Sequence, residues 1–151
     1  MLLLPVLAKP LQKHPKQLRL GKIGILGIYL FVNLYLTLLS RSPNDSRSVV
    51  WMPFWSYVET LNGDRALGIQ ILLNILLYIP LGYLLRFTFP RIKAWQIIVI
   101  GCLLSMLTET VQLIFKLGLF EWDDMFHNTL GTVIGVGAYW GMKKVIGKPR
   151  K

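Results

Sequence analysis

The chain has 151 residues, of which 54% are hydrophobic and only 16% are charged, and its mean hydropathy is +0.51. This apolar fraction excludes an ordinary soluble domain and indicates a membrane protein whose helices share one interior. The net charge of +10 does not indicate nucleic-acid binding, because the basic residues are distributed as membrane topology requires.

Residues 1–19 combine a short apolar start with prolines and a basic cluster. The apolar run precedes the charges and no small-residue cleavage site follows it, which is the reverse of a cleavable signal peptide. We therefore expect a basic cytoplasmic leader here, then a transmembrane domain over residues 20–146 and a basic cytoplasmic tail over residues 147–151.

Four apolar segments have about the ~20 residues that a helix needs to cross a bilayer. They predict spans over residues 20–39, 67–86, 94–115 and 126–146, and hence an all-α bundle of four transmembrane helices. Pro80 in the second span is tolerated because neighbouring helices satisfy the freed backbone carbonyl. The fourth span is the least apolar, and its glycines lie four residues apart, which allows close helix approach and offers a route to an oligomer.

The Lys and Arg residues orient these spans. Five lie in the N-terminal flank, three between the second and third spans, and five in the C-terminal flank, out of 17 in the chain. Six of the seven acids lie in the other two loops. Both termini of this multi-pass protein are therefore expected in the cytoplasm, with the basic excess facing anionic lipid.

The loop over residues 40–66 carries a cluster of aromatic residues around Pro53. Such residues settle at the headgroup level of a membrane, so an interfacial anchor is the plain interpretation. The alternative is a lid over an outward-facing pocket.

Polar side chains occur in all four spans, in the halves away from the cytoplasm. At 1.5 Å per residue, Asn33, Asn74 and Glu109 lie roughly 10 Å below the outer ends of their helices. Gln112 lies one turn nearer the surface and Asn128 enters the fourth span at the same level. Amides between transmembrane helices commonly only join them, for ~0.6 kcal/mol each. Glu109 is different, because an ionisable group inside a membrane is by default functional.

The turn before the fourth span holds Glu121, Asp123 and Asp124. Acids at this place stabilise a helix N-terminus, which is the structural alternative to a site. His127 beside them matches no specific metal spacing, so no metal site is predicted. Cys102 is the only cysteine, and the chain has no phosphate loop, GxSxG or CxxC motif, so no cofactor is expected either.

Three blocks of the sequence resemble the VanZ-like family, which is named for a teicoplanin-resistance protein. They are NILLYIPLG over residues 74–82, ETVQ over residues 109–112, and FEWDDMFHNTLGTVIG over residues 120–135. The resemblance covers most of residues 50–140. It implies site positions at Asn74, Pro80, Gly82, Glu109, Gln112, Asp124, Asn128 and Gly131.

The chain departs from the family pattern at two places. Many relatives carry an arginine shortly before the acidic turn, where this chain has Gly118 and Leu119, and Val50 stands where an asparagine is common. Another cation must then balance Asp123 and Asp124, and we expect Lys116 to do so.

We expect a VanZ-like membrane protein that reduces susceptibility to glycopeptide or lipoglycopeptide antibiotics through a polar pocket at the outer leaflet. The expected pocket residues are Asn74, Tyr78, Glu109, Gln112, Asp123, Asp124 and Asn128, with Pro80, Gly82, Gly131 and Gly135 as structural residues. The expected partners are the lipid bilayer and an amphiphilic or lipid-linked ligand, and no nucleic acid.

Two alternatives remain open. One is a membrane enzyme acting on a lipid-linked envelope intermediate, with Glu109 and Asp124 as acid and base, although the lack of a nucleophile argues against it. The other is a structural or regulatory subunit that packs on another membrane protein through the glycines of the fourth span.

Overall fold

The computed structural model describes residues 15–43, 45 and 48–146, so most of the expected leader and the whole of the tail lie outside the described residues. Its elements in chain order are α2 (Pro15–Leu34), the π-helix η1 (Tyr35–Leu39), β1 (Ser48–Val50), α3 (Trp55–Leu61), α4 (Arg65–Thr88), α5 (Ala94–Phe115), β2 (Leu119–Glu121) and α6 (Trp122–Ile146). The first long helix thus begins at Pro15, five residues before the predicted span.

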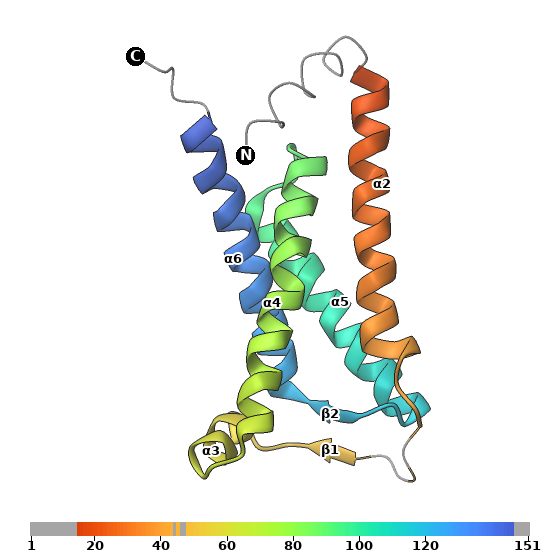
Figure 1. Ribbon diagram of the computed structural model, residues 1–151, viewed down its shortest axis with the longest axis vertical. Helices are drawn as coiled ribbons and strands as arrows, with labels where there is room; N and C mark the ends of the chain where they lie inside the picture. Colours follow the sequence, from red (N-terminus) through yellow and green to blue (C-terminus); the bar gives the residue numbers. More distant parts are fainter. Residues whose placement is uncertain (1–14, 44, 46–47, 147–151) are drawn as a thin grey trace.

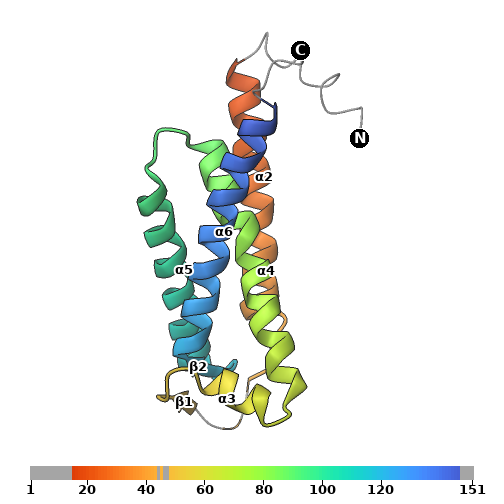
Figure 2. The same cartoon turned by 90° about the vertical axis from the view of Figure 1, so that its left-hand side faces the viewer.

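The four long helices α2, α4, α5 and α6 run side by side along the long axis of the molecule (Figures 1 and 2). The start of α2, the connection from α4 to α5 and the end of α6 lie at one end. The strands, α3 and the loops around them lie at the other end. We call these the basic end and the acidic end, because eight of the eleven described Lys and Arg residues lie at the first, and the acids in segments 45–64 and 109–124 lie at the second.

Three helices are long and apolar enough to cross a membrane: Lys16–Leu39, Arg65–Thr88 and Ala94–Phe115. They correspond to the first three predicted spans. The fourth predicted span is also a helix, α6, of 25 residues. It is not apolar enough to qualify by composition, because histidine, asparagine, threonine and glycine take the place of large apolar side chains along it.

The polar and glycine positions of α6 face α4 and α5, which explains its composition. A Cβ atom on Gly131 or Gly135 would come closer than 3.0 Å to a backbone carbonyl of α4, and one on Gly82 would meet the backbone of α6 in the same way. The backbones of α4 and α6 therefore lie in direct contact along this line. Gly137 and Gly141 have open space beside them, so a second copy of the chain would have to use those positions.

Strands β1 and β2 pair in parallel, with Ser48 opposite Leu119 and Val50 opposite Glu121. The all-α prediction missed them, because three-residue strands are too short to show an alternating pattern in the sequence. Their pairing joins the loop after η1 to the turn before α6, so the two loops of the acidic end form one layer across the helix ends (Figure 1).

Candidate functional site

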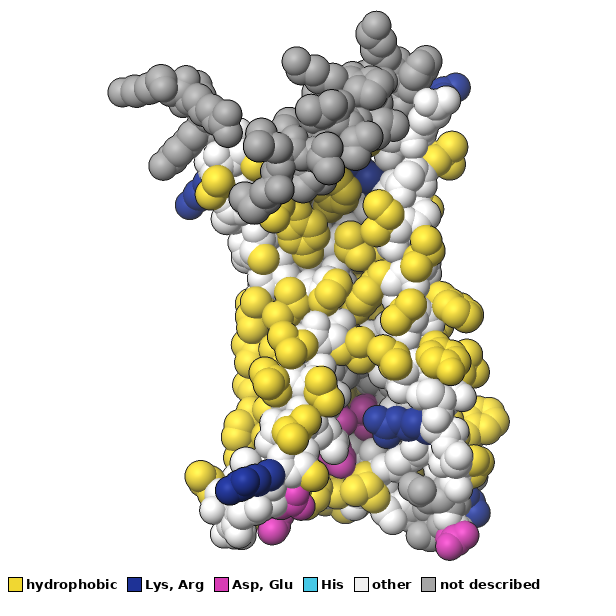
Figure 3. Space-filling view, in the orientation of Figure 1, with side chains coloured by type: hydrophobic (Ala, Val, Ile, Leu, Met, Phe, Trp, Pro, Cys, Tyr) yellow, Lys and Arg dark blue, Asp and Glu magenta, His cyan; other side chains and the backbone are white. Residues whose placement is uncertain are grey.

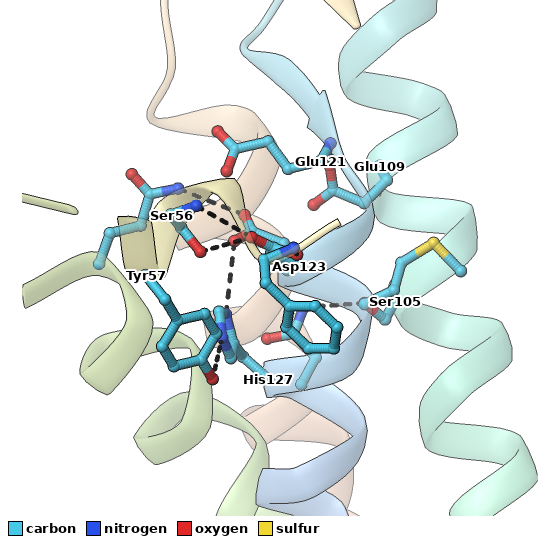
Figure 4. A network of polar contacts seen from close by, with 12 residues as sticks. Ser56, Tyr57, Ser105, Glu109, Glu121, Asp123 and His127 are labelled. Carbon is cyan, nitrogen blue, oxygen red and sulfur yellow. Dashed lines mark hydrogen bonds and ion pairs between the residues drawn. The ribbon is translucent and has the colours of Figure 1, made fainter. Parts of the chain in front are cut away.

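The acidic end contains an unusual density of buried polar side chains, shown in Figure 4. Those less than one-tenth exposed are Ser56, Ser105, Thr108, Glu109, Gln112, Glu121, Asp123, Asp124, His127 and Asn128. They come from α3, from the second half of α5, from β2 and from the first turns of α6. Sequence analysis anticipated the acids and amides among them, but not Ser56, Thr108 or the partner of His127.

Asp123 binds the loop before α3 to the start of α6. One carboxylate oxygen accepts a hydrogen bond from the backbone N–H of Phe54 at 2.6 Å, and the other accepts from the backbone N–H and the hydroxyl of Ser56, at 3.1 and 2.6 Å. Phe54 has a left-handed backbone conformation, with φ of 60°, that turns these donors toward α6. The acid stands in the first turn of α6 as the helix dipole favours, but it holds the aromatic loop in place.

His127 is fully buried between Tyr57, which lies 70 residues away in the sequence, and Asp124, which lies one turn earlier on α6. Its Nε2 lies 2.8 Å from the hydroxyl oxygen of Tyr57, and its Nδ1 lies 4.0 Å from a carboxylate oxygen of Asp124. Burial, and then the nearby charge of Asp123, raises the pKa of the Tyr57 hydroxyl, which keeps that group protonated. The hydroxyl of Tyr57 and the imidazole can exchange a proton directly. Nδ1 has no hydrogen-bond partner among the described residues, so the carboxylate of Asp124 acts on the ring through its charge alone.

Glu109 points from α5 toward the strand β2. Its carboxylate accepts a hydrogen bond from the backbone N–H of Glu121 at 3.2 Å, and its side chain is only 2% exposed. The charges of Asp124 and Glu121 repel this carboxylate, and the charge of Arg41 attracts it. The intramembrane acid therefore lies inside the protein, at the edge of a group of acids.

Arg41 also corrects one expectation. A Cβ on Gly118 would lie 2.7 Å from a guanidinium nitrogen of Arg41, so this arginine occupies the space beside the position where relatives carry their own. Lys116, the expected cation, instead donates a hydrogen bond to the backbone carbonyl of Asp45 at 3.1 Å. The cation that acts on Glu109 comes from the loop after η1.

Glu121 ends β2 and is 3% exposed. Burial raises the pKa of its carboxyl to about 7, the charge of Asp124 adds to this, and the side chains of Gln70 and Trp55 partly oppose it. The ordinary value is 4.5, so the folded state binds this proton more tightly than the unfolded chain does. Its contribution to stability is complete below pH 4.5 and is lost as the pH rises through 7.

The predicted amides lie at this end, but they form hydrogen bonds with other residues and not with one another. Asn128 donates to the hydroxyl of Ser105 at 2.8 Å, and Gln112 donates to the backbone carbonyl of Thr37 at 3.0 Å. The amide nitrogen of Asn74 is buried without a described partner. Among the described residues, no hydrogen bond joins any two of Asn74, Glu109, Gln112 and Asn128.

Tyr78, the remaining predicted residue, is fully buried, with its hydroxyl beside Thr108 and Ser105. Two clefts among the described residues lie at the basic end, so they do not supply the expected pocket. Acidic side chains are nevertheless visible between the helices at the acidic end, next to a basic one (Figure 3). Within the described part of the chain, no three His, Cys, Asp or Glu side chains are grouped to hold a metal ion.

Comparison with known proteins agrees with the resemblance found in the sequence. The family model described as VanZ/LLP1 matches residues 26–144. Protein VanZ of Enterococcus faecium is 28% identical over 130 residues, covering 80% of this chain and 76% of that protein. No solved structure matches the chain.

Proposed function

The chain belongs to the VanZ/LLP1 family, and from this premise we propose that it is a bacterial envelope protein that lowers susceptibility to teicoplanin-type antibiotics. The finer part of the proposal is that α6 is a fourth span, that the basic end faces the cytoplasm, and that the acidic end acts at the outer leaflet. The low hydropathy of α6 does not argue against a fourth span, because the least apolar positions of this helix face α4 and α5.

The observation that carries the proposal is the buried acid group of Glu109, Glu121, Asp123 and Asp124 beneath a loop held by hydrogen bonds. Asp123 is satisfied by its hydrogen bonds to the loop, but Glu109, Glu121 and Asp124 are buried together with few hydrogen-bond donors, and this arrangement costs free energy. An amphiphilic ligand has a polar body for such a site and acyl chains for the surrounding membrane. A lipoglycopeptide or a lipid-linked envelope intermediate has this chemistry.

The test is the susceptibility of a host that expresses the protein. Glu109→Gln keeps the shape of the side chain but removes its charge, and we expect it to abolish the rise in the inhibitory concentration of teicoplanin. Glu59→Gln is the matched control, because it makes the same change on α3 at the same end, outside the buried group. Equal protein levels in the membrane must be shown by immunoblot. Full protection by Glu109→Gln would refute the proposed role of the acid group.

The proposed topology has its own test. Leu61 at the end of α3 is 88% exposed. A cysteine placed there in a Cys102→Ala background should react with a membrane-impermeant maleimide in intact cells. Reaction only after the cells are opened would place the acidic end in the cytoplasm.

A second candidate function is favoured by the series Tyr57, His127 and Asp124. In an enzyme on a lipid-linked intermediate, His127 would exchange a proton with the substrate while Asp124 stabilises the charged imidazole. Mass spectra of lipid extracts from cells with and without the protein would then differ by a converted lipid, and His127→Gln would remove the difference. Identical extracts would exclude this candidate.

A further inference from the structure

Among the described residues, the basic end includes no acidic side chain. The sequence contains no Asp or Glu in residues 1–44, 65–108 or 125–151, which supply that whole end of the bundle. All seven acids belong to segments 45–64 and 109–124. The Lys and Arg side chains of the basic end must therefore be neutralised by anions from outside the folded chain.

One cleft at this end combines such charges with apolar walls. It has a volume of about 440 Å³ and lies between the first turns of α2 and the connection from α4 to α5. Leu18, Phe89 and Ile92 contribute apolar surface. Its basic lining residues are Arg19, Lys22 and Arg91.

The walls of the cleft are fixed by hydrogen bonds. The guanidinium of Arg86 donates to the backbone carbonyls of Pro90 and Ile92, which holds the connection in shape. The ammonium of Lys22 donates to the carbonyl of Phe87 at 3.3 Å and stands 4.1 Å above the ring of Phe87. The cleft is thus formed before any ligand binds.

Arg19 and Arg91 are different from these two cations. Both are exposed, and within the described residues neither takes part in a hydrogen bond or an ion pair. They come from opposite sides of the cleft, one from α2 and one from the connection, and both guanidinium groups are free to bind a phosphate.

We propose that this cleft binds the headgroup of an anionic glycerophospholipid. The phosphodiester lies between Arg19 and Arg91, and the glycerol backbone and the first acyl carbons lie along Leu18, Phe89 and Ile92. A volume of about 440 Å³ is within the ordinary range of small-molecule sites. Its position where apolar helices end is the depth of lipid headgroups, and basic pockets between helices at that depth bind them. A zwitterionic headgroup is disfavoured, because its ammonium would meet Lys22.

The experiment is a lipid titration of the purified, delipidated protein, followed by native mass spectrometry. Phosphatidylglycerol and phosphatidylethanolamine with identical acyl chains are compared. The wild type should prefer phosphatidylglycerol. Arg19→Gln combined with Arg91→Gln should weaken its binding by roughly 30-fold, at about five-fold for each charge lost near an anionic headgroup. Binding of phosphatidylethanolamine should be unchanged.

The matched control is Lys16→Gln combined with Lys144→Gln, which removes two charges from the same end but from outside the cleft. The affinity of this control variant for phosphatidylglycerol should stay within about three-fold of the wild-type value, because salt screens exposed charges that lie outside the cleft. The double variant Arg19→Lys and Arg91→Lys should also bind like the wild type. This result would show that the glutamine variant loses binding because it loses charge and not because it unfolds.

Three results would overturn the proposal. In the first, the glutamine variant at Arg19 and Arg91 keeps the wild-type preference. In the second, the control variant loses as much binding, so that diffuse surface charge explains the effect. In the third, glycerol phosphate without acyl chains binds as tightly as the whole lipid, so that the apolar walls contribute nothing.

Discussion

The contact of Asp123 with the loop before α3 gives the sharpest prediction. Its carboxylate receives three hydrogen bonds, from two backbone N–H groups and one hydroxyl, and its side chain is 3% exposed. Asp123→Asn exchanges one oxygen for an NH₂ group. The amide turns so that its oxygen keeps both bonds to Ser56, because this loses fewest bonds. The N–H of Phe54 then faces another donor and has no partner.

A buried donor without a partner costs ~1–3 kcal/mol. The substitution therefore lowers the free energy that is needed to open the loop locally, because Asp123 is the contact that ties Phe54 and Ser56 to α6. Each 1.4 kcal/mol is a factor of ten, so the amides of Phe54 and Ser56 should exchange with solvent roughly 5 to 150 times faster. Asp123→Ala deprives all three donors and should accelerate exchange further.

The assay is amide hydrogen exchange of the protein in detergent, measured by mass spectrometry on a peptide that covers residues 52–58. Glu59→Gln is the control, because it removes a charge from the adjacent helix α3 without breaking a bond to α6. If Asp123→Asn changes the exchange by less than two-fold, or if the control accelerates it equally, Asp123 does not hold this loop.

Three further predictions concern stability, each measured by thermal unfolding in detergent. The stability of the wild type should fall between pH 5 and pH 8 because the carboxyl of Glu121, whose pKa is raised, ionises in this range, and Glu121→Gln should abolish part of that fall; an unchanged pH profile would contradict this. Gly135→Ala should force α6 away from α4 and lower stability by ~1–3 kcal/mol, whereas Gly137→Ala has open space and should be neutral or slightly stabilising. Equal effects of the two would exclude the close approach. Tyr57→Phe should cost ~1–3 kcal/mol by leaving His127 without its hydroxyl partner, and a melting temperature equal to that of the wild type would show that the pair is not formed.

The sequence predicts the long helices well and their membrane character less completely. Long apolar runs are a strong signal, and α4 and α5 begin and end within about two residues of the predicted spans. The fourth helix shows the limit. Its composition is set by contact with α4 rather than with lipid, so hydropathy by itself underestimates it.

The sequence predicts how far along the helices the residues of the candidate site lie, but not which groups they bind. The helix rise places Glu109 and Asn128 at one level, and both lie at the acidic end. Glu109, however, binds a backbone N–H, a group that every residue except proline carries, so its sequence context gives no hint of the partner. Tyr57 and His127 are 70 residues apart, and only the folded chain brings them together.

The position of Arg41 was missed for a similar reason. Sequence analysis sought the compensating cation near the acidic turn and chose Lys116, the nearest basic residue along the chain. The parallel pairing of β1 with β2 brings the loop after η1 alongside that turn, and with it Arg41. A strand pair of three residues carries no sequence signal, but it brings together the segments that place Arg41 beside Gly118 and its charge near Glu109.

The glycine contact between α4 and α6 has a consequence for how the protein is made. With histidine, asparagine and threonine along one side, α6 taken alone gains too little from hydrocarbon to leave an aqueous channel for the bilayer. In the proposed topology with α6 as the fourth span, this helix becomes a favourable membrane segment only when α4 is already there to cover those atoms. Biogenesis would then be sequential, and a bulky residue at Gly131 or Gly135 would act first by stalling the last helix during synthesis, so that the cell degrades the chain before any activity can be measured.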